Sequence, residues 1–179
     1  MGGENWLLQP LHGMNRSWIG SAVLLLAVVL LVLRPWESDE AKVAASVVVP
    51  VTRVIDGDTI AVLLDGQEED VRLIGIDTPE TVKPDTPVQC FGPRASDFTH
   101  STLEGKTVRL VFGAERHDVY GRLLAYVYLG RRFFNPILAR RGLARPLTIP
   151  PNDRFAPLFR RLARRAALGG RGLWGACPP

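Results

Sequence analysis

Residues 47–76 read VVVPVTRVIDGDTIAVLLDGQEEDVRLIGI, and this stretch decides the fold. Its β-branched and apolar runs predict three short strands, at Val47–Arg53, Thr59–Leu64 and Val71–Ile76. Asp56-Gly57-Asp58 supplies a turn before the second run, and Asp65-Gly66 marks a hairpin before the third. The stretch therefore predicts consecutive strands joined by tight turns.

Two further strands are expected at Thr107–Phe112 and Leu123–Tyr128, before a turn at Leu129-Gly130. Together with the first three they make five short strands in a chain of 179 residues. With helices between them, such strands fit a mainly β, α+β domain built as a partly open five-stranded barrel of the OB type.

Helices are indicated in three places by end signals and apolar spacing. Gly92-Pro93 can open the first helix. Asn135-Pro136 provides a cap and a first-turn proline for the second, which Gly142 can end. In the third helix, the spacing predicts one apolar face made of Phe155, Leu158, Leu162 and Ala166.

An uncharged run, SWIGSAVLLLAVVLLVL, fills positions 17–33 between two arginines. Its length lies between a signal-peptide core and a membrane span, and Arg34-Pro35-Trp36 resembles the interfacial border of a span. We therefore expect a transmembrane anchor, with a cleaved signal helix as the alternative. The expected divisions are a tail at 1–16, the hydrophobic helix at 17–33, a linker at 34–46, the folded domain at 47–175 and a second tail at 176–179.

Charge is divided unevenly along the chain. Residues 47–130 hold 8 Lys/Arg against 13 Asp/Glu, whereas residues 131–179 hold 11 Arg and one acid, Asp153. A basic segment attracts polyanions such as nucleic acid or anionic lipid, and an acidic one suits a cation site. A solvated arginine-rich face is the alternative interpretation. The 2 cysteines and 3 histidines have no ligand spacing, which excludes a zinc site.

The placement of the folded domain depends on the orientation of the hydrophobic helix. The positive charges on its two sides nearly balance, so the bias from the positive-inside rule is weak. A short N-terminal tail usually stays inside. The expected location is therefore the extracytoplasmic side of a membrane, or the exterior if the helix is cleaved.

Three clusters carry the residue types that phosphodiester chemistry needs: Ile55 to Thr59, Val71 to Glu80, and Asp118 to Tyr126. A phosphodiester is an anion, so hydrolysis is helped by a hard cation on carboxylates, by guanidinium groups on the phosphate oxygens, and by a carboxylate that activates water. The side chains suited to these three tasks are Asp58 and Asp77, Arg72 and Arg122, and Glu80, respectively. Taken alone, each cluster also fits a structural turn or a surface strand.

In this order and spacing, the clusters resemble the thermonuclease family, typified by staphylococcal nuclease. The resemblance runs from about residue 51 to residue 174 and includes three further motifs: Phe91-Gly92-Pro93 with Ala95, Asn135 with Leu138, and Gly142-Leu143-Ala144. It implies an OB-fold barrel with three helices that uses Ca²⁺. It also implies cleavage of DNA and RNA, single strands preferred, at the 5′ P–O bond to leave 3′-phosphates, with no obligate protein partner.

The resemblance further implies individual roles. The metal ligands would be the carboxylates of Asp58 and Asp77 and the backbone carbonyl of Thr78, with Asp56 beside them. The catalytic residues would be Arg72 and Arg122, which stabilise charge on the phosphate, and Glu80, the general base. The substrate-binding residues would be Tyr120 and Lys83, both as phosphate contacts.

Two departures from the family pattern bear on substrate binding. Val119 stands where the family has a lysine before Tyr-Gly-Arg, and residues 145–149 lack the aromatic residues that stack on a base. Because stacking contributes about 1–3 kcal/mol per base, we expect weaker or differently selective binding.

Two alternatives remain open from the sequence. If the domain is exported, Cys90 and Cys177 can form a disulfide; otherwise both remain free thiols. The domain as a whole could also be a catalytically weak or inactive OB-fold module that binds nucleic acid at a membrane. The enzyme is favoured because Asp58, Arg72, Asp77, Glu80 and Arg122 are all present.

Overall fold

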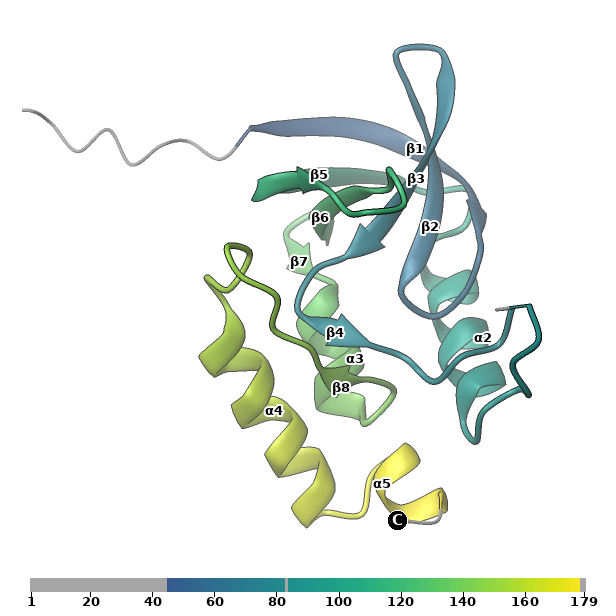
Figure 1. The fold of residues 1–179 in the computed structure, drawn as a ribbon, viewed down its shortest axis with the longest axis vertical. Coiled ribbons are helices and arrows are strands. Elements are labelled where there is room, and N and C mark those ends of the chain that lie inside the picture. The colour runs from purple at the N-terminus through teal and green to yellow at the C-terminus, as the bar shows by residue number, and fades with distance from the viewer. Residues whose placement is uncertain (1–44, 83, 178–179) are drawn as a thin grey trace, which may run out of the picture. The chain divides into compact units, whose positions relative to one another are not determined.

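The computed structural model describes residues 45–82 and 84–177. Five strands form a barrel (Figure 1): β1 (Ser46–Val54), β2 (Thr59–Leu64), β3 (Gln67–Leu73), β5 (Thr107–His117) and β6 (Leu123–Leu129). Neighbours in the order β3-β2-β1-β5-β6 run antiparallel, and a parallel pairing of β3 with β6 closes the ring. The predicted five-stranded OB-type barrel is confirmed.

The barrel closes around fully buried branched side chains. Ile60 and Val62 on β2, Val71 on β3 and Leu110 on β5 are each 0% exposed. Successive residues of a strand point to opposite faces, so alternate residues of β5 enter this core. The two-residue turn predicted at Asp65-Gly66 joins β2 to β3, because Leu64 pairs with Gln67 across it.

The prediction of one continuous strand at Val71–Ile76 is wrong. β3 ends at Leu73, and a separate strand β4 (Ile76–Asp77) pairs with β8 (Arg145–Pro146) outside the barrel sheet. Gly75 makes the break: its φ is 88°, and an added Cβ would strike the ring of Phe159. The break carries Asp77 away from the barrel strands.

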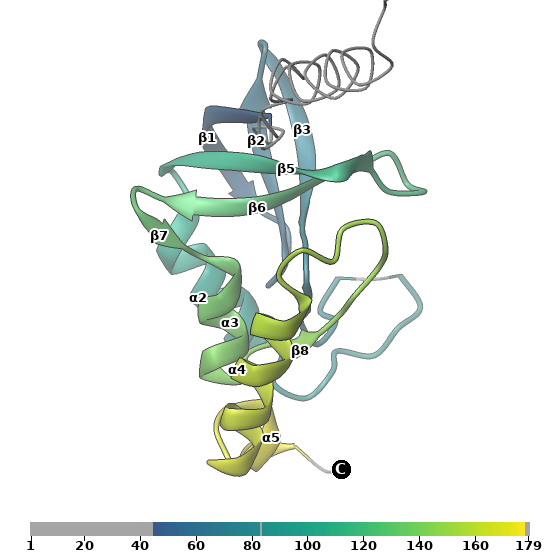
Figure 2. The same ribbon diagram turned by 90° about the vertical axis from the view of Figure 1, so that its left-hand side faces the viewer.

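Helices gather at one end of the barrel (Figures 1 and 2). They are α2 (Gly92–Leu103), α3 (Asn135–Arg141), α4 (Ala156–Leu168) and the single turn α5 (Leu173–Ala176), and a short strand β7 (Arg132–Phe133) extends the sheet beside β6. Each of the three longer helices has a proline in its first turn, where no N–H is needed. The prediction of three helices is thereby confirmed.

Asn135 does not cap α3, contrary to the sequence prediction. The cap residue is Phe134, and no side chain bonds to the exposed N–H groups of the first turn. The Asn135 amide instead accepts from Val127 N at 2.9 Å and donates to Ile74 O at 2.9 Å. Asn135 therefore fastens α3 to the barrel rather than to its own backbone.

The apolar face predicted for α4 is displaced by about one residue. The buried row is Ala156, Phe159, Ala163 and Ala166, so of the predicted face only Ala166 is confirmed as buried, whereas Phe155, Leu158 and Leu162 are only half buried. Small alanine side chains let α4 approach α3, its principal helical neighbour, closely. The larger residues then pack along the margin of the contact.

The hydrophobic helix expected at residues 17–33 lies outside the described residues. Within residues 45–82 and 84–177, no helix combines the length and the apolar character that crossing a bilayer requires.

Candidate active site

The turn between β1 and β2 places two carboxylates side by side. Asp58 N donates to Asp56 Oδ1 at 2.9 Å, which fixes the Asp56 side chain over the turn. Thr99 of α2 donates to the carbonyl of Gly57 at 2.7 Å. A Cβ at Gly57 would lie 2.8 Å from the side chain of Thr78, so only glycine fits the contact with that residue.

Asp58 is almost completely buried, with 4% of its surface exposed. Its Oδ2 accepts from Thr78 N at 2.6 Å and from Thr78 Oγ1 at 2.9 Å. Its Oδ1 lies 3.1 Å from Arg72 Nε and accepts from Thr59 Oγ1 at 3.2 Å. These contacts join the first two sequence clusters into one site.

Arg72 is the centre of this cluster. Its guanidinium bridges Asp58 and Asp77, with Nη2 lying 2.7 Å from Asp77 Oδ1. Nη1 donates to the carbonyls of Leu73 at 2.9 Å and Ile76 at 2.8 Å, in the segment where β3 breaks into β4. The bent backbone thus holds a planar cation in one orientation, with each of its three nitrogens facing a protein oxygen.

The two turn carboxylates resist ionisation in the absence of a further positive charge. Burial, reinforced by repulsion from Asp58, raises the pKa of Asp56 to about 6. Burial also raises the pKa of Asp58, although Arg72 and the hydrogen bonds from Thr78 oppose this shift. One guanidinium therefore does not fully compensate the acids around it.

The donor set in this cluster fits a hard divalent cation. Asp56, Asp58 and Asp77 offer carboxylate oxygens and Thr78 a backbone carbonyl, which are the ligand types that Ca²⁺ takes. Within residues 45–82 and 84–177, no three acidic, His or Cys side chains already converge as a metal cluster. The chemistry of the residues fits the ion, and the raised pKa of the buried acids gives a physical reason for a cation there.

Glu80 lies in the turn that follows Asp77, at the neck of a loop. Its Oε1 accepts from the N–H groups of Thr81 at 2.8 Å and Val82 at 2.9 Å. Gln89 joins the two ends of this loop. Its side-chain Oε1 accepts from Glu80 N at 3.0 Å, and its backbone N–H donates to Glu80 O at 2.9 Å. The Glu80 carboxylate is thereby held in one place. Lys83, expected as a phosphate contact, lies outside the described residues.

Arg122 is positioned by Asp118, four residues earlier. Its Nε lies 2.7 Å from Asp118 Oδ2, and its backbone N–H donates to Asp118 Oδ1 at 3.0 Å. Burial opposes the ionisation of Asp118, but these bonds from Arg122 and one from Tyr120 N leave its pKa lowered. Among the described residues, the terminal nitrogens of Arg122 have no protein acceptor, so they can meet an anion.

A cavity of about 270 Å³ connects the two arginines. Arg72 and Arg122 both line it: Arg72 lies on β3, and Arg122 directly precedes β6, the strand that pairs with β3. The rest of its wall is mainly apolar and includes Val119, Leu147, Ile149 and the largely exposed Tyr120. The aliphatic Leu147 and Ile149 stand in the segment where the sequence lacks aromatic residues.

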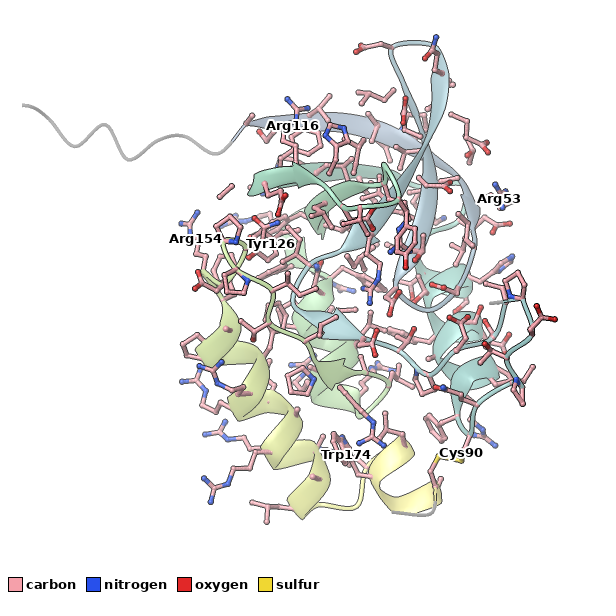
Figure 3. All side chains as sticks on the ribbon, viewed as in Figure 1. Arg53, Cys90, Arg116, Tyr126, Arg154 and Trp174 are labelled. Carbon is pink, nitrogen blue, oxygen red and sulfur yellow. A yellow bond between two sulfur atoms is a disulfide. The ribbon has the colours of Figure 1, made fainter. Side chains whose placement is uncertain are left out.

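A disulfide joins Cys90 to Cys177, with 5.8 Å between their Cα atoms. Figure 3 shows Cys90 beside α5, so the bond ties the residue after Gln89 to the last turn of the domain. Asp77, Thr78 and Gln89 line a cavity of about 240 Å³ together with both cysteines.

The structure brings Asp56, Asp58, Arg72, Asp77 and Thr78 into direct contact and places Arg122 and Tyr120 around the same cavity as Arg72. Glu80 belongs to the adjoining turn, where its carboxylate accepts from the N–H groups of Thr81 and Val82. Sequence reasoning missed the positioning roles of Asp118, Thr99 and Gln89. For Asp118, a signal existed in the opposite charge four residues before Arg122.

Comparison with known proteins agrees with this arrangement. The profile of the family described as staphylococcal nuclease homologue matches residues 70–176. A thermonuclease of Staphylococcus intermedius is 44% identical over 167 residues, which cover 90% of this chain and 99% of that protein. A thermonuclease of Staphylococcus hyicus is 40% identical over the same coverage. Endonuclease YncB of Bacillus subtilis is 38% identical over 128 residues, 70% of this chain and 61% of that protein. The chain belongs to the family of staphylococcal nuclease homologues.

Proposed function

We propose that this protein is a Ca²⁺-dependent nuclease that hydrolyses DNA and RNA at the 5′ P–O bond and leaves 3′-phosphates. The observation that carries the proposal is the shared cavity of Arg72 and Arg122, each oriented by a carboxylate partner. The match to the nuclease family and to proteins named thermonuclease supports the same activity.

The two arginines bind and polarise the phosphate. Guanidinium groups donate hydrogen bonds to phosphate oxygens, and charge gathers on those oxygens as the transition state forms. Asp118 fixes Arg122 through Nε and leaves its outer nitrogens for the substrate. The leaving 5′ oxygen needs a proton, and Arg122 would donate it.

Glu80 is the residue suited to take the proton of the attacking water. Two backbone N–H groups orient its carboxylate, and Gln89 holds the neck of its loop. Because the general base is already oriented, the reaction does not bear the entropy cost of ordering this carboxylate.

Asp58, Asp77 and the carbonyl of Thr78 would hold Ca²⁺, with Asp56 beside them. When bound, the ion supplies positive charge to the phosphate and acidifies a water molecule. Its presence would also offset the burial, and the repulsion from Asp58, that together raise the pKa of Asp56 to about 6.

Single strands are the preferred substrates in this account. A base can enter the cavity beside Arg72 and Arg122 only if it leaves its pairing partner and its stack. Val119, Leu147 and Ile149 would contact the base through apolar surface, while the hydroxyl of Tyr120 and the amine of Lys83 would contact phosphate. Without aromatic stacking, the affinity per base is expected to be low.

The test uses the full-length chain and a 5′-labelled single-stranded DNA, with Ca²⁺ or with a chelator. Glu80→Gln should lower kcat by about 10²–10⁴-fold, the range for loss of a general base. Arg122→Gln should lower kcat by about 10²–10³-fold, as for loss of one group that stabilises transition-state charge. The chemistry of the product ends is tested by polymerase extension. A 3′-phosphate blocks extension until a phosphatase removes it.

Matched controls make the test specific. Glu69→Gln and Arg131→Gln repeat the same chemical changes away from the site and should leave cleavage unchanged. Wild-type cleavage that persists in chelator, or catalytic variants as active as these controls, would refute the proposal. Binding without cleavage would favour the rival interpretation, an inactive OB-fold module.

We also propose that the domain works on the extracytoplasmic side, anchored through residues 17–33 or released after cleavage there. The disulfide between Cys90 and Cys177 supports this, because such bonds persist in oxidising compartments. Fractionation with protease protection should find the domain outside the membrane. Recovery of a reduced, protected domain would contradict this placement.

A further inference from the structure

A second hollow surface runs over α2 and α3 and takes no part in the site described above. One part, of about 600 Å³, lies between α2, the β6–β7 turn, α3 and Leu162 of α4. The other, of about 880 Å³, lies between α2, α3 and the segment before α5. Phe98, Arg140 and Arg141 line both parts, so the two form one rear groove.

The rear groove is strongly basic. Its charged lining consists of five arginines and one acid: Arg94, Arg132, Arg140, Arg141, Arg171 and Asp97. In the part of the chain that the structure describes, no carboxylate lies within ion-pair distance of any of these arginines. By contrast, Arg72 and Arg122 in the active site are both paired. The groove therefore presents a row of uncompensated positive charge.

Its arginines are combined with aromatic rings. The guanidinium carbon of Arg141 lies 4.6 Å from the centre of the Phe98 ring, and that of Arg94 lies 5.8 Å from the centre of Phe91. A guanidinium plane on a ring is rigid and offers a second flat surface to an incoming base. Alternating cations and flat faces are what single-stranded nucleic acid contacts in sequence-tolerant grooves.

The shape of the surface favours a strand over a bilayer. A lipid surface is contacted by protruding apolar side chains, but none of the large exposed apolar residues lines the rear groove. Phe91, Phe98 and Phe133, which line it, are half buried, so they offer a flat membrane little protruding apolar surface. A polynucleotide can follow such a hollow with its phosphates on the arginines.

The rear groove shares no lining residue with the cavity of Arg72 and Arg122, but one end of it lies near the smaller cavity that contains Asp77 and Thr78. Figure 2 shows β8 on one side of α3 and α2 on the other. At one end, Phe91 and Gly172 directly adjoin Cys90 and Leu173, which line the cavity that contains Asp77 and Thr78. A long strand could therefore engage both surfaces of one molecule.

We propose that the rear groove is a second, non-catalytic binding site for a single-stranded nucleic acid segment that extends beyond the catalytic cavity. It adds a holding site to the proposed function, and it is tested by binding alone. Failure of cleavage would leave this binding result unaffected, so the two proposals fail separately.

The experiment measures the affinity of the full-length chain for a 30-nucleotide single-stranded DNA in chelator, at several salt concentrations. The double variant Arg140→Gln/Arg141→Gln should bind about tenfold more weakly at low salt, and the slope of log K against log salt should fall by about 1.4, or about 0.7 for each lost phosphate contact. Arg140→Lys/Arg141→Lys, which keeps the charge, should recover most of the affinity.

The matched control is Arg160→Gln/Arg164→Gln on α4, which removes the same charge from exposed positions that line neither part of the groove. It should bind as wild type does. Equal losses in both double variants, or no loss in either, would overturn the proposal. It would also be overturned if Arg140→Gln/Arg141→Gln kept its DNA affinity but lost binding to phosphatidylserine vesicles. Arg160→Gln/Arg164→Gln should unfold at the wild-type temperature, since those side chains are exposed, and Arg140→Gln/Arg141→Gln only slightly lower, since it loses the contact of Arg141 with the Phe98 ring.

Discussion

Asn135 shows how one buried amide can fix a helix to a barrel. It is 0% exposed, and its side chain bonds to Val127 N, Ile74 O and Ala125 O. Replacing Asn135 with Leu keeps the volume but leaves these backbone groups without partners. We expect the free energy of unfolding to fall by about 3 kcal/mol, measured by urea denaturation. A loss below about 0.5 kcal/mol, the scale of a neutral surface change, would show that the amide is not needed.

At the residue scale, the catalytic candidates could be predicted but their supports could not. Alternation along residues 71–73 indicated that Arg72 leaves the core, and its side chain does meet Asp58 and Asp77. Asn135 was expected to cap a helix, because Asn before Pro is a common start signal. Its true partners lie 8, 61 and 10 residues away, beyond the reach of any local pattern.

Helix α4 depends on small residues where it meets its neighbours. Ala163 is 3% exposed in the buried row, whereas Ala167 of the same helix is exposed. Ala163→Leu would force three additional carbons into a filled interface, so unfolding free energy should fall by about 1–3 kcal/mol. Ala167→Leu is the control and should change it by less than about 0.5 kcal/mol. Similar effects from both substitutions would mean that the buried row is misassigned.

At the element scale, the sequence located the strands and helices but misjudged details that depend on contacts. The run from Val71 to Ile76 looks continuous because every residue except Gly75 suits a strand. What divides it is the ring of Phe159, which occupies the space of a side chain at Gly75. The apolar face of α4 was displaced for a related reason: large residues carry the periodicity signal, while alanines make the closest contact.

The disulfide acts on the molecule as a whole, because it closes a loop with a sequence separation of 87 residues. Cys90→Ser/Cys177→Ser should lower the free energy of unfolding by about 4 kcal/mol, since the unfolded chain regains the conformations that the bond excludes. Guanidinium denaturation of the variant and of the oxidised wild type measures this difference. Equal stabilities would contradict a structural role for the bond.

At the scale of the molecule, the barrel could be expected from five strands and their turns, yet its closure could not. The parallel pairing of Val71 with Leu123 joins segments about fifty residues apart and leaves no periodic signal in either. That pairing also brings β3, which carries Arg72, next to β6, which Arg122 directly precedes, and both arginines line the same cavity. The resemblance to a known family supplied this part of the expectation.

The central claim is that the acids around Arg72 hold Ca²⁺ for cleavage. The most direct measurement is a calcium titration of single-stranded DNA cleavage by the full-length wild type, Asp77→Asn and Asp70→Asn, the last being an exposed control on β3. The account predicts activity that saturates with Ca²⁺ and vanishes in chelator. It also predicts that Asp77→Asn needs at least about tenfold more Ca²⁺, because a neutral amide replaces one charged ligand, while Asp70→Asn follows wild type. Cleavage independent of Ca²⁺, or identical titrations for all three proteins, would contradict it.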